Sequence, residues 1–165
     1  MPNLVRWQRE AEVAIWWGEA DKSEDEIAAK WLRRAEGSGS DYDRNTIRYV
    51  IVVDGNDIGL IQSYDLRHYP AHAAEVGIPN AAGLDIFVGE SEWRNKGIGT
   101  SIVQKFVEEY VFAIPGIETC VIDPDPENKR AMRSYEKAGF EYVKSYYSNE
   151  NKMNVYLMRQ ERGQR

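Results

Sequence analysis

An alternation of strand and helix patterns between residues 82 and 139 is the feature that most restricts the fold of this chain. The run "AGLDIFVGE" is typical of a strand, and apolar residues at helical spacing from Ile98 to Val111 then indicate a strongly amphipathic helix. The apolar run "ETCVID" indicates a buried strand, and residues 131–138 indicate a second helix, which Gly139 ends. This alternation predicts a sheet with helices on its faces.

Two further helices are predicted near the start of the sequence. The first spans residues 3–17, because its apolar residues recur at helical spacing, and it ends at Gly18. The second begins at a capping box formed by Ser23 and Glu26. The side chains expected to face the core are Leu4, Trp7, Ala11 and Ile15 in the first helix and Ile27, Trp31 and Leu32 in the second.

Two hairpins complete the predicted elements. Residues 47–66 hold two β-rich runs around the turn from Asp54 to Asp57, and "FEYVKSYY" is expected to pair with "MNVYLMRQ" at the end of the sequence. Residues 37–43 are expected to be a flexible loop. Residues 68–82 are expected to be a long irregular loop, because they contain two prolines and no clear period. We therefore predict one α/β domain over residues 1–165, with a mixed sheet flanked by helices.

Charge and cysteine content restrict the class of partner. The formal net charge of −6 argues against nucleic acid, because phosphate binding requires a basic surface, and it favours a cationic ligand. No apolar run approaches the roughly 20 residues of a membrane span, and the first residues lack a signal-peptide pattern. Cys120 is the only cysteine, so no intrachain disulfide can form and a cytoplasmic location is expected. The apolar run around Cys120 predicts a buried, inert thiol.

No metal site is expected. His68 and His72 stand four residues apart, a spacing that binds zinc on a helix. Pro70 lies between them and disfavours that helix.

Gly97 and Gly99 stand where the long amphipathic helix begins, directly after Arg94 and Lys96. Backbone amides without intrahelical partners and the helix macrodipole favour an anion there, and glycine lets the backbone approach it closely. A phosphate or diphosphate is the expected ligand, and a glycine turn without a ligand is the alternative. The sequence has no Walker A motif here, and Ile102 stands where a dinucleotide fingerprint has its third glycine.

Two signatures resemble those of the GCN5-related N-acetyltransferases (GNAT). The segment "RNKGIG" resembles the R/Q-x-x-G-x-G/A signature, and "NKRAMRSYEKAGF" resembles the second signature of the family. The resemblance covers roughly residues 4–159 and is closest to the bacterial aminoglycoside 6'-N-acetyltransferases, whose motifs match "EVAIWWG", "IGLIQSY", "GLDIFVGESEWRNKGIGT", "IDPDPENKRAMRSYEKAGF" and "VYLM" in order. It implies the GNAT acyl-CoA N-acyltransferase fold, with acetyl-CoA as cofactor and no metal.

The sequence departs from that branch at its start. Members usually begin with a β-strand, whereas the first helix here starts almost at Met1. Either that first strand is absent, or the sheet starts at "IRYVIVV". The outer edge of the sheet would then be unpaired and open to self-association, so a monomer and a homodimer both remain alternatives.

Asp85 and Tyr135 are the expected catalytic residues. A charged side chain inside the strand "GLDIFVG" is costly unless it is used or paired, and the resemblance assigns Asp85 to the acceptor amine, as a base acting directly or through water. A structural salt bridge is the alternative for Asp85. Tyr135 lies on the apolar face of its helix, where a core role is usual, but the resemblance implies that its phenol protonates the leaving thiolate.

The resemblance also implies a set of cofactor-binding residues. Backbone amides from Phe87 to Gly89 would contact the acetyl carbonyl and the pantetheine arm, and the glycine turn would wrap the diphosphate. Asn128 would contact the cofactor, although an N-cap residue also has a structural role. The full set is Phe87, Val88, Gly89, Arg94, Asn95, Lys96, Gly97, Ile98, Gly99, Thr100 and Asn128.

The expected acceptor-binding residues are Trp17, Gln62, Tyr64, Asp85 and Asp123. Asp123 begins the turn "DPDPEN", where its carboxylate either binds an ammonium group or is a surface turn residue. One of Trp16 and Trp17 is expected in the core, and the resemblance favours Trp17 as an apolar wall against a sugar ring. Glu75 and Glu90 are expected to add negative charge that attracts a polycation.

The implied activity is transfer of an acetyl group from acetyl-CoA to a primary amine by direct attack in a ternary complex. The amine expected from the resemblance is the 6'-amine of an aminoglycoside antibiotic, and its acetylation would give resistance. The alternatives are the same chemistry on a siderophore hydroxylamine, a polyamine or a protein N-terminus, or a CoA-binding module without catalysis. The expected partner is therefore a cationic small molecule, with neither nucleic acid nor a membrane involved.

Overall fold

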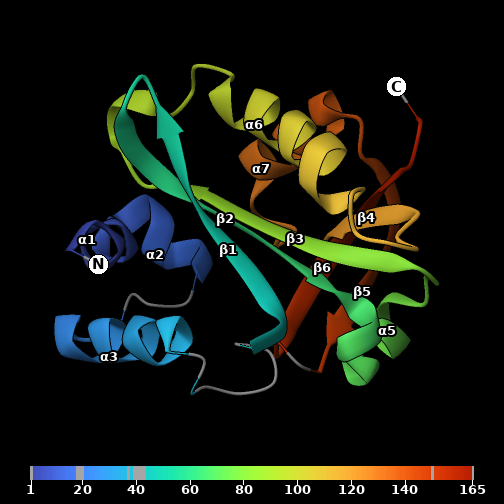
Figure 1. Ribbon diagram of the computed structural model, residues 1–165, viewed down its shortest axis with the longest axis horizontal. Coiled ribbons are helices and arrows are strands. Elements are labelled where there is room, and N and C mark those ends of the chain that lie inside the picture. The colour runs from blue at the N-terminus through green and yellow to red at the C-terminus, as the bar shows by residue number, and fades with distance from the viewer. Residues whose placement is uncertain (1, 18–20, 37, 39–43, 150, 165) are drawn as a thin grey trace. The chain divides into compact units, whose positions relative to one another are not determined.

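The computed structural model describes residues 2–17, 21–36, 38, 44–149 and 151–164 (Figure 1). The chain divides into two compact units. Unit 1 comprises Met1–Gln62 and Ile86–Arg94, and unit 2 comprises Ser63–Asp85 and Asn95–Arg165. The chain passes from one unit to the other within β2, within β3 and again between Arg94 and Asn95.

The strands of the described residues form a mixed six-stranded sheet, in the order β1-β2-β3-β4-β6-β5. Strand β3 runs parallel to β4, while β4 and β5 both run antiparallel to β6. The strands are β1 (Thr46–Val53), β2 (Asn56–Asp65), β3 (Ala81–Val88), β4 (Thr119–Ile122), β5 (Glu141–Ser148) and β6 (Met153–Glu161). This arrangement confirms the predicted mixed α/β class, and the described chain begins with helices, as expected.

The predicted first helix is two helices in the structure, α1 (Pro2–Arg9) and α2 (Ala11–Trp17). The Glu10 amide donates to the Trp7 carbonyl, and the Glu10 carbonyl then accepts from Val13 and Ala14, so one helix ends and the next begins at this residue. Around one straight helix Trp7 and Val13 would point roughly 120° apart. The break at Glu10 lets both side chains enter the same core, which explains why the prediction of a continuous helix was wrong.

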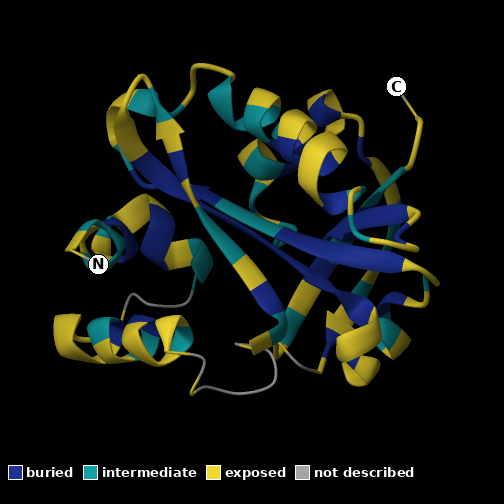
Figure 2. Ribbon diagram, in the orientation of Figure 1, coloured by how far each residue is buried: buried dark blue, intermediate teal, exposed yellow. Residues whose placement is uncertain are grey.

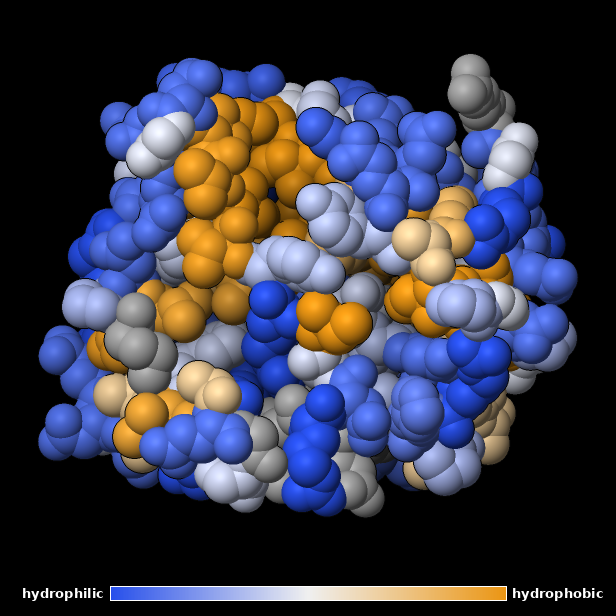
Figure 3. Space-filling view, viewed as in Figure 1, coloured by the Kyte–Doolittle hydropathy of each residue, from blue (hydrophilic) through white to orange (hydrophobic). Residues whose placement is uncertain are grey.

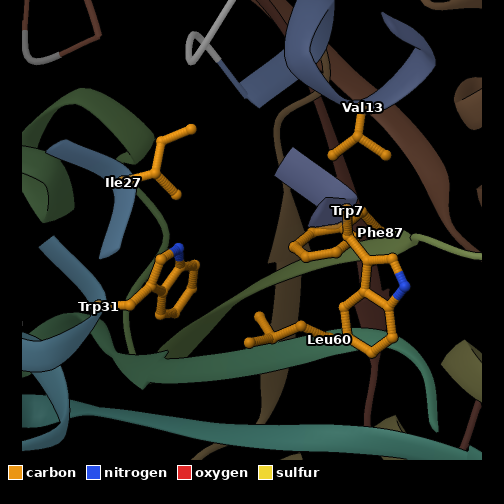
Figure 4. Close-up of a cluster of buried hydrophobic side chains, with 6 residues drawn as sticks. All are labelled: Trp7, Val13, Ile27, Trp31, Leu60 and Phe87. Carbon is orange, nitrogen blue, oxygen red and sulfur yellow. The ribbon is translucent and has the colours of Figure 1, made fainter. Parts of the chain in front are cut away.

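The core of unit 1 is a cluster of buried side chains that α1, α2, α3 (Glu24–Ala35), β2 and β3 contribute (Figure 4). The rings of Trp7 and Phe87 pack edge to face, with centroids 6.2 Å apart. The cluster consists of Trp7, Val13, Ile27, Trp31, Leu60 and Phe87. Ile15 and Leu32 were expected to face the core, but they are 65% and 51% exposed, because tertiary packing selects a narrower face than the helical pattern suggests.

Local signals position two other parts of unit 1. The Ser23–Glu26 capping box opens α3 as predicted, since each side chain bonds the backbone amide of the other residue. The β1–β2 hairpin turns at Asp54 and Gly55, whose φ values of 50° and 77° are those of a type I′ turn. The predictions that concern Gly18 and most of the loop over residues 37–43 lie outside the described residues.

Strand β1 is at one end of the strand order, and its exposed side chains are apolar. Val50 and Val52 are among the exposed hydrophobic residues of the described chain. Figure 3 shows hydrophobic side chains gathered over the second half of β1. The expectation that β1 opens the sheet is therefore confirmed for the described residues.

In unit 2 the segment expected to be an irregular loop contains a short 3-10 helix, η1 (Leu66–His68), and helix α5 (Pro70–Val76). Pro70 occupies the first turn of α5, where its missing amide costs nothing, and Gly77 ends the helix in the left-handed conformation at φ 70°. Pro70 thus opens an ordered helix and Pro79 lies in the turn after it, so the prediction of an irregular loop was wrong for residues 70–76.

Helices α6 (Ile98–Phe106) and α7 (Lys129–Ala138) lie side by side in unit 2 (Figure 1). Thr100 pairs with Ser134 through their hydroxyl groups at 2.9 Å, and Gln104 donates to the Lys137 carbonyl at 3.2 Å. Since both partners advance together along the chain, the two helices run parallel and their N-termini lie on the same side. A π-helical turn, η3 (Val107–Val111), continues α6 almost to the predicted end.

The core of unit 2 surrounds the parallel strand pair. Residues Ala81–Leu84 of β3 and all of β4 are buried, as Figure 2 shows in dark blue. Cys120 is fully buried in β4, which confirms the predicted buried thiol.

Candidate active site

The N-terminus of α6 offers backbone amides to an anion. Gly97 is the N-cap in the left-handed conformation, with φ 77°, and it supplies no capping side chain. The first backbone bond into the helix runs from the Ser101 amide to the Gly97 carbonyl, so the amides of residues 98–100 have no acceptor within the helix. No atom lies within 4 Å of the position that a Cβ of Gly97 would take. The turn is therefore both polar and open, as a diphosphate site requires.

The N-terminus of α7 adds a second polar group on the same side. Asn128 caps α7, because its Oδ1 accepts from the Ala131 amide at 3.1 Å. This bond uses the carbonyl oxygen and leaves the two amide protons of Asn128 to other acceptors. As α6 and α7 are parallel, their positive dipole ends reinforce each other.

The Arg94 side chain bonds to the end of β3, and its predicted contact with the cofactor stays a prediction. Its guanidinium donates to the Val88 carbonyl at 2.8 Å and to the Gly89 carbonyl, and the side chain is only 9% exposed. The guanidinium therefore holds the end of β3, inside unit 1. The next residue, Asn95, has the left-handed backbone, with φ 61°.

Gly89 differs from the expectation. Its amide donates to the Ile58 carbonyl at 2.8 Å, so it is not available to a pantetheine arm. A Cβ at Gly89 would lie 2.1 Å from Cγ of Trp7, so glycine is required here for packing. The donor functions predicted for Phe87 and Val88 stay predictions. Trp17 packs edge to face on Phe87, with centroids 4.8 Å apart, and its predicted wall function also stays a prediction.

Asp85, Asp123 and Tyr135 lie close together in unit 2. The parallel register pairs Gly83 with Val121, and the same offset brings Asp85 level with Asp123, just beyond the end of β4. Burial raises the pKa of Tyr135, and the charges of Asp85 and Asp123 raise it further. The phenol therefore keeps its proton at neutral pH, as a proton donor must.

The two other predicted acceptor residues are more buried than a surface cleft requires. Tyr64 is 6% exposed and its ring lies against Gly83 of β3. Gln62, in unit 1, is 2% exposed. Their contacts with an acceptor stay predictions.

Glu75 and Glu90 hold elements together. The Glu75 carboxylate accepts from the Ser148 hydroxyl at 2.9 Å and the Asn149 amide at 2.8 Å. Glu90 accepts from the Arg6 guanidinium and from Nε1 of Trp7. Burial of Glu75 opposes a lower pKa, but the bonds from Ser148 and Asn149 outweigh it and lower the pKa of Glu75. The bonds from Arg6 and Trp7 lower the pKa of Glu90. Both carboxylates hold elements together while keeping their negative charge, and the expectation that they attract a polycation stays a prediction.

No group of three or more His, Cys, Asp or Glu side chains that could hold a metal exists among the described residues. His72 is buried in α5 and His68 is exposed at the end of η1.

Within the described residues no helix is long and apolar enough to cross a membrane.

Sequence reasoning missed two residues that shape unit 2. Ser134 bonds Thr100, and its Oγ would lie 3.8 Å from a Cβ at Gly99, so it supports the glycine turn from α7. Gly83 makes room for Tyr64. A serine inside a helix carries no particular signal, but a glycine two residues before Asp85 in an apolar strand marks a close approach of another group.

Within the described residues the protein thus combines a mixed α/β sheet with an open helix N-terminus and a carboxylate–phenol cluster, both of which lie in unit 2. The chain belongs to the GNAT acetyltransferase family, because the family model described as "Acetyltransferase (GNAT) domain" matches residues 1–147.

Comparison with individual proteins gives the same family. The chain is 31% identical over 141 residues to the aminoglycoside N(6')-acetyltransferase type 1 of Klebsiella pneumoniae, covering 84% of this chain and 67% of that protein. The crystal structure of the aminoglycoside acetyltransferase AAC(6')-Ib in complex with coenzyme A and kanamycin is similar, with a TM-score of 0.80 and 27% identity over 96% of this chain and 87% of that one. A complex of AAC(6')-Ib with paromomycin and acetyl-CoA gives a TM-score of 0.81 at 28% identity, over 96% and 86% of the two chains.

Proposed function

We propose that this chain transfers an acetyl group from acetyl-CoA to the 6'-amine of an aminoglycoside, by direct attack in a ternary complex. The observation that carries the proposal is the cluster of Asp85, Asp123 and Tyr135 in the unit that also holds the open N-terminus of α6. The similarity to aminoglycoside acetyltransferases supports the choice of acceptor.

Acetyl-CoA fits the residues at the α6 and α7 N-termini. The amides of residues 98–100 would hold its diphosphate, and the Asn128 amide group would donate to the same ligand. Open space at Gly97 lets the phosphates approach the backbone. When bound, acetyl-CoA supplies the activated acyl group as a thioester.

Asp85 and Tyr135 would move the two protons of the reaction. Asp85 accepts a proton from the acceptor amine, directly or through water, so that a neutral nitrogen can attack the carbonyl carbon. Tyr135 donates the proton of Oη to the departing sulfur, and the second proton that the nitrogen loses on forming the amide restores the phenol. Asp123 lies level with Asp85 and would hold a further ammonium group of the acceptor.

Thiol release from acetyl-CoA tests the proposal. We expect release with kanamycin or tobramycin, and little or none with spermidine or hydroxylamine. Asp85→Asn should lower kcat by about 10²- to 10⁴-fold, because it removes a general base, while the Kd of CoA stays nearly unchanged. Asp125→Asn is the matched control, since the Asp125 carboxylate accepts from the Glu127 amide within its own turn.

Other outcomes would replace this function by a different one. Release with spermidine but not with kanamycin would make the chain a polyamine acetyltransferase. Tight CoA binding with no release for any amine would make it a binding module. Unchanged kcat in Asp85→Asn would contradict the function of Asp85 alone.

A further inference from the structure

Gly83 lies on β3 with ordinary strand backbone, so its conformation does not require glycine. The lack of space around Gly83 does require glycine. A Cβ built on Gly83 would lie 2.3 Å from both Cε2 and Cζ of Tyr64 and 2.6 Å from its Oη. Atoms that are not bonded do not approach so closely. The ring of Tyr64 therefore lies directly against the strand, in the space that any side chain at position 83 would fill.

Other aromatic side chains hold the Tyr64 ring in this place. The ring of Tyr69 packs edge to face on it, with centroids 5.4 Å apart and an interplanar angle of 80°. The centroid of the His72 imidazole lies 6.1 Å from that of the Tyr64 ring, and the two rings are tilted by 53°. Tyr64 is only 6% exposed. A ring confined by the strand and by two neighbouring rings has little freedom to move sideways.

Helix α5, which carries His72, is in turn fixed to the β5–β6 hairpin. The Glu75 carboxylate accepts from Ser148 and from Asn149, and Nζ of Lys144 donates to the Glu75 carbonyl at 2.7 Å. These three bonds join α5 to the middle of β5, to its last residue and to the turn that follows. The wall behind Tyr64 is therefore tied to the sheet, and the ring position is set by the fold of unit 2.

Gly83 and Asp85 are two residues apart on one strand, so they face the same side of the sheet. The Tyr64 ring, which lies against Gly83, is therefore on the same face of the sheet as Asp85. We propose that Gly83 is a positioning residue, which sets the approach of the acceptor to Asp85 by leaving the space in which the Tyr64 ring lies. The inference rests on the proposed function, in which Asp85 receives the acceptor amine.

This arrangement favours one class of acceptor. Because Tyr64 is only 6% exposed, its ring supports the wall of the acceptor site from behind and offers no free face for stacking. A rigid wall on the side of a carboxylate suits an amine carried on a rigid sugar ring, and a flexible linear polyamine gains less from it. A methyl group at position 83 would push the ring away from the strand, into the space that the acceptor needs.

The test combines kinetics with a cycle of variants. Gly83→Ala should raise the KM of kanamycin about tenfold or more, with the KM of acetyl-CoA unchanged within about twofold, because only the acceptor side is displaced. It should also lower Tm, and it should lower Tm much less in a Tyr64→Ala background, where no ring has to move. The KM of kanamycin should stay high in the double variant, because the ring that positions the acceptor is missing.

Ala81→Gly is the matched control. It changes one methyl group on the same face of β3, at a residue that is 1% exposed, so it should lower Tm while the KM of kanamycin stays unchanged. An active Gly83→Ala enzyme with the wild-type KM for kanamycin would overturn the inference, as would equal Tm losses in the two backgrounds. A wild-type enzyme that acetylates no amine would instead overturn the proposed function, and the acceptor-positioning function with it.

Discussion

The phenol of Tyr135 is a proton donor whose surroundings keep it protonated. Burial and the charges of Asp85 and Asp123 raise its pKa. Tyr135→Phe should therefore lower kcat by about 10²-fold, since general acid catalysis contributes about 10²- to 10⁴-fold, and leave the Kd of CoA nearly unchanged. Thiol-release kinetics measure this.

The pH dependence of the wild type follows from the direction of that shift. Because the folded pKa of Tyr135 lies above its ordinary value near 10, the acid form persists throughout the range in which the enzyme can be assayed. No alkaline loss of kcat should therefore come from this residue. Tyr147→Phe, at an exposed tyrosine, is the control and should leave kcat unchanged. A Tyr135→Phe enzyme with full kcat would show that the phenol is only a core residue.

Gly97 and Gly55 allow backbone strain to be separated from ligand binding. Both have φ 77°, and a Cβ on either would meet no atom within 4 Å. Alanine at either position should cost about 1–2 kcal/mol of folding free energy, because left-handed backbone is unfavourable for a residue with a Cβ. Only Gly97→Ala should also raise the Kd of CoA, about tenfold or more, since its methyl group crowds the phosphate turn.

Isothermal titration and thermal unfolding of the two alanine variants measure these effects. Gly55→Ala should lower Tm and keep the wild-type Kd for CoA. Equal increases in the Kd of CoA for both variants would mean that backbone strain, and not crowding at the Gly97 turn, weakens CoA binding.

At the scale of elements, Glu90 connects the start of the chain to the end of β3. Hydrogen bonding from Arg6, with a further bond from Trp7, lowers the pKa of Glu90 below its ordinary 4.5. A lowered carboxyl pKa means that this contribution to stability is complete above about pH 4.5 and is lost as the pH falls through the lowered value. Glu90→Gln should therefore lower the free energy of unfolding by about 1 kcal/mol at pH 7, since the Arg6 pair is half exposed.

Urea unfolding between pH 3 and pH 7 measures the effect of Glu90→Gln. The difference between the variant and the wild type should shrink toward pH 3, where the wild-type carboxyl becomes protonated. Glu92→Gln, at an exposed neighbouring residue, should follow the wild-type curve. A difference that grows toward low pH would contradict the assigned bonds.

Elements with local signals could be predicted from the sequence, and elements fixed by distant contacts could not. The Ser23–Glu26 box and the Asp54–Gly55 turn depend on residues at most three positions apart, so their sequence carries the information. Helix α5 and the break at Glu10 depend on what the chain packs against. The helical spacing of apolar residues in 3–17 predicts one continuous helix. Trp7 and Val13 enter the same core because the chain breaks at Glu10, which that spacing does not indicate.

The candidate site divides in the same way. The open turn at Gly97 and the cluster around Asp85 follow from motifs, because glycines and a strand carboxylate are unusual at those points. The bonds of Arg94 to the β3 carbonyls and those of Glu75 to the β5–β6 turn join residues far apart or depend on side-chain direction. The sequence and its family resemblance could not predict these structural hydrogen bonds, and the ligand contacts expected of both side chains stay predictions.

For the whole molecule, the formal net charge of −6 should accelerate the encounter with a polycationic acceptor. Salt screens this attraction, so kcat/KM for kanamycin should fall about three- to tenfold between roughly 20 mM and 300 mM NaCl. The same titration with acetyl-CoA, an anion, should show no such fall. A kcat/KM for kanamycin that is independent of salt would contradict electrostatic attraction by the whole chain.

The buried position of Cys120 has a practical consequence for studying this enzyme. The chain contains a single sulfhydryl, and it is fully inaccessible, with burial and Asp85 both raising its pKa. A chromogenic disulfide reagent added to the native enzyme should therefore count only product molecules, without background from the catalyst. Slow uptake of one equivalent of reagent per chain would then record global opening of the fold, so the same cuvette reports both turnover and unfolding.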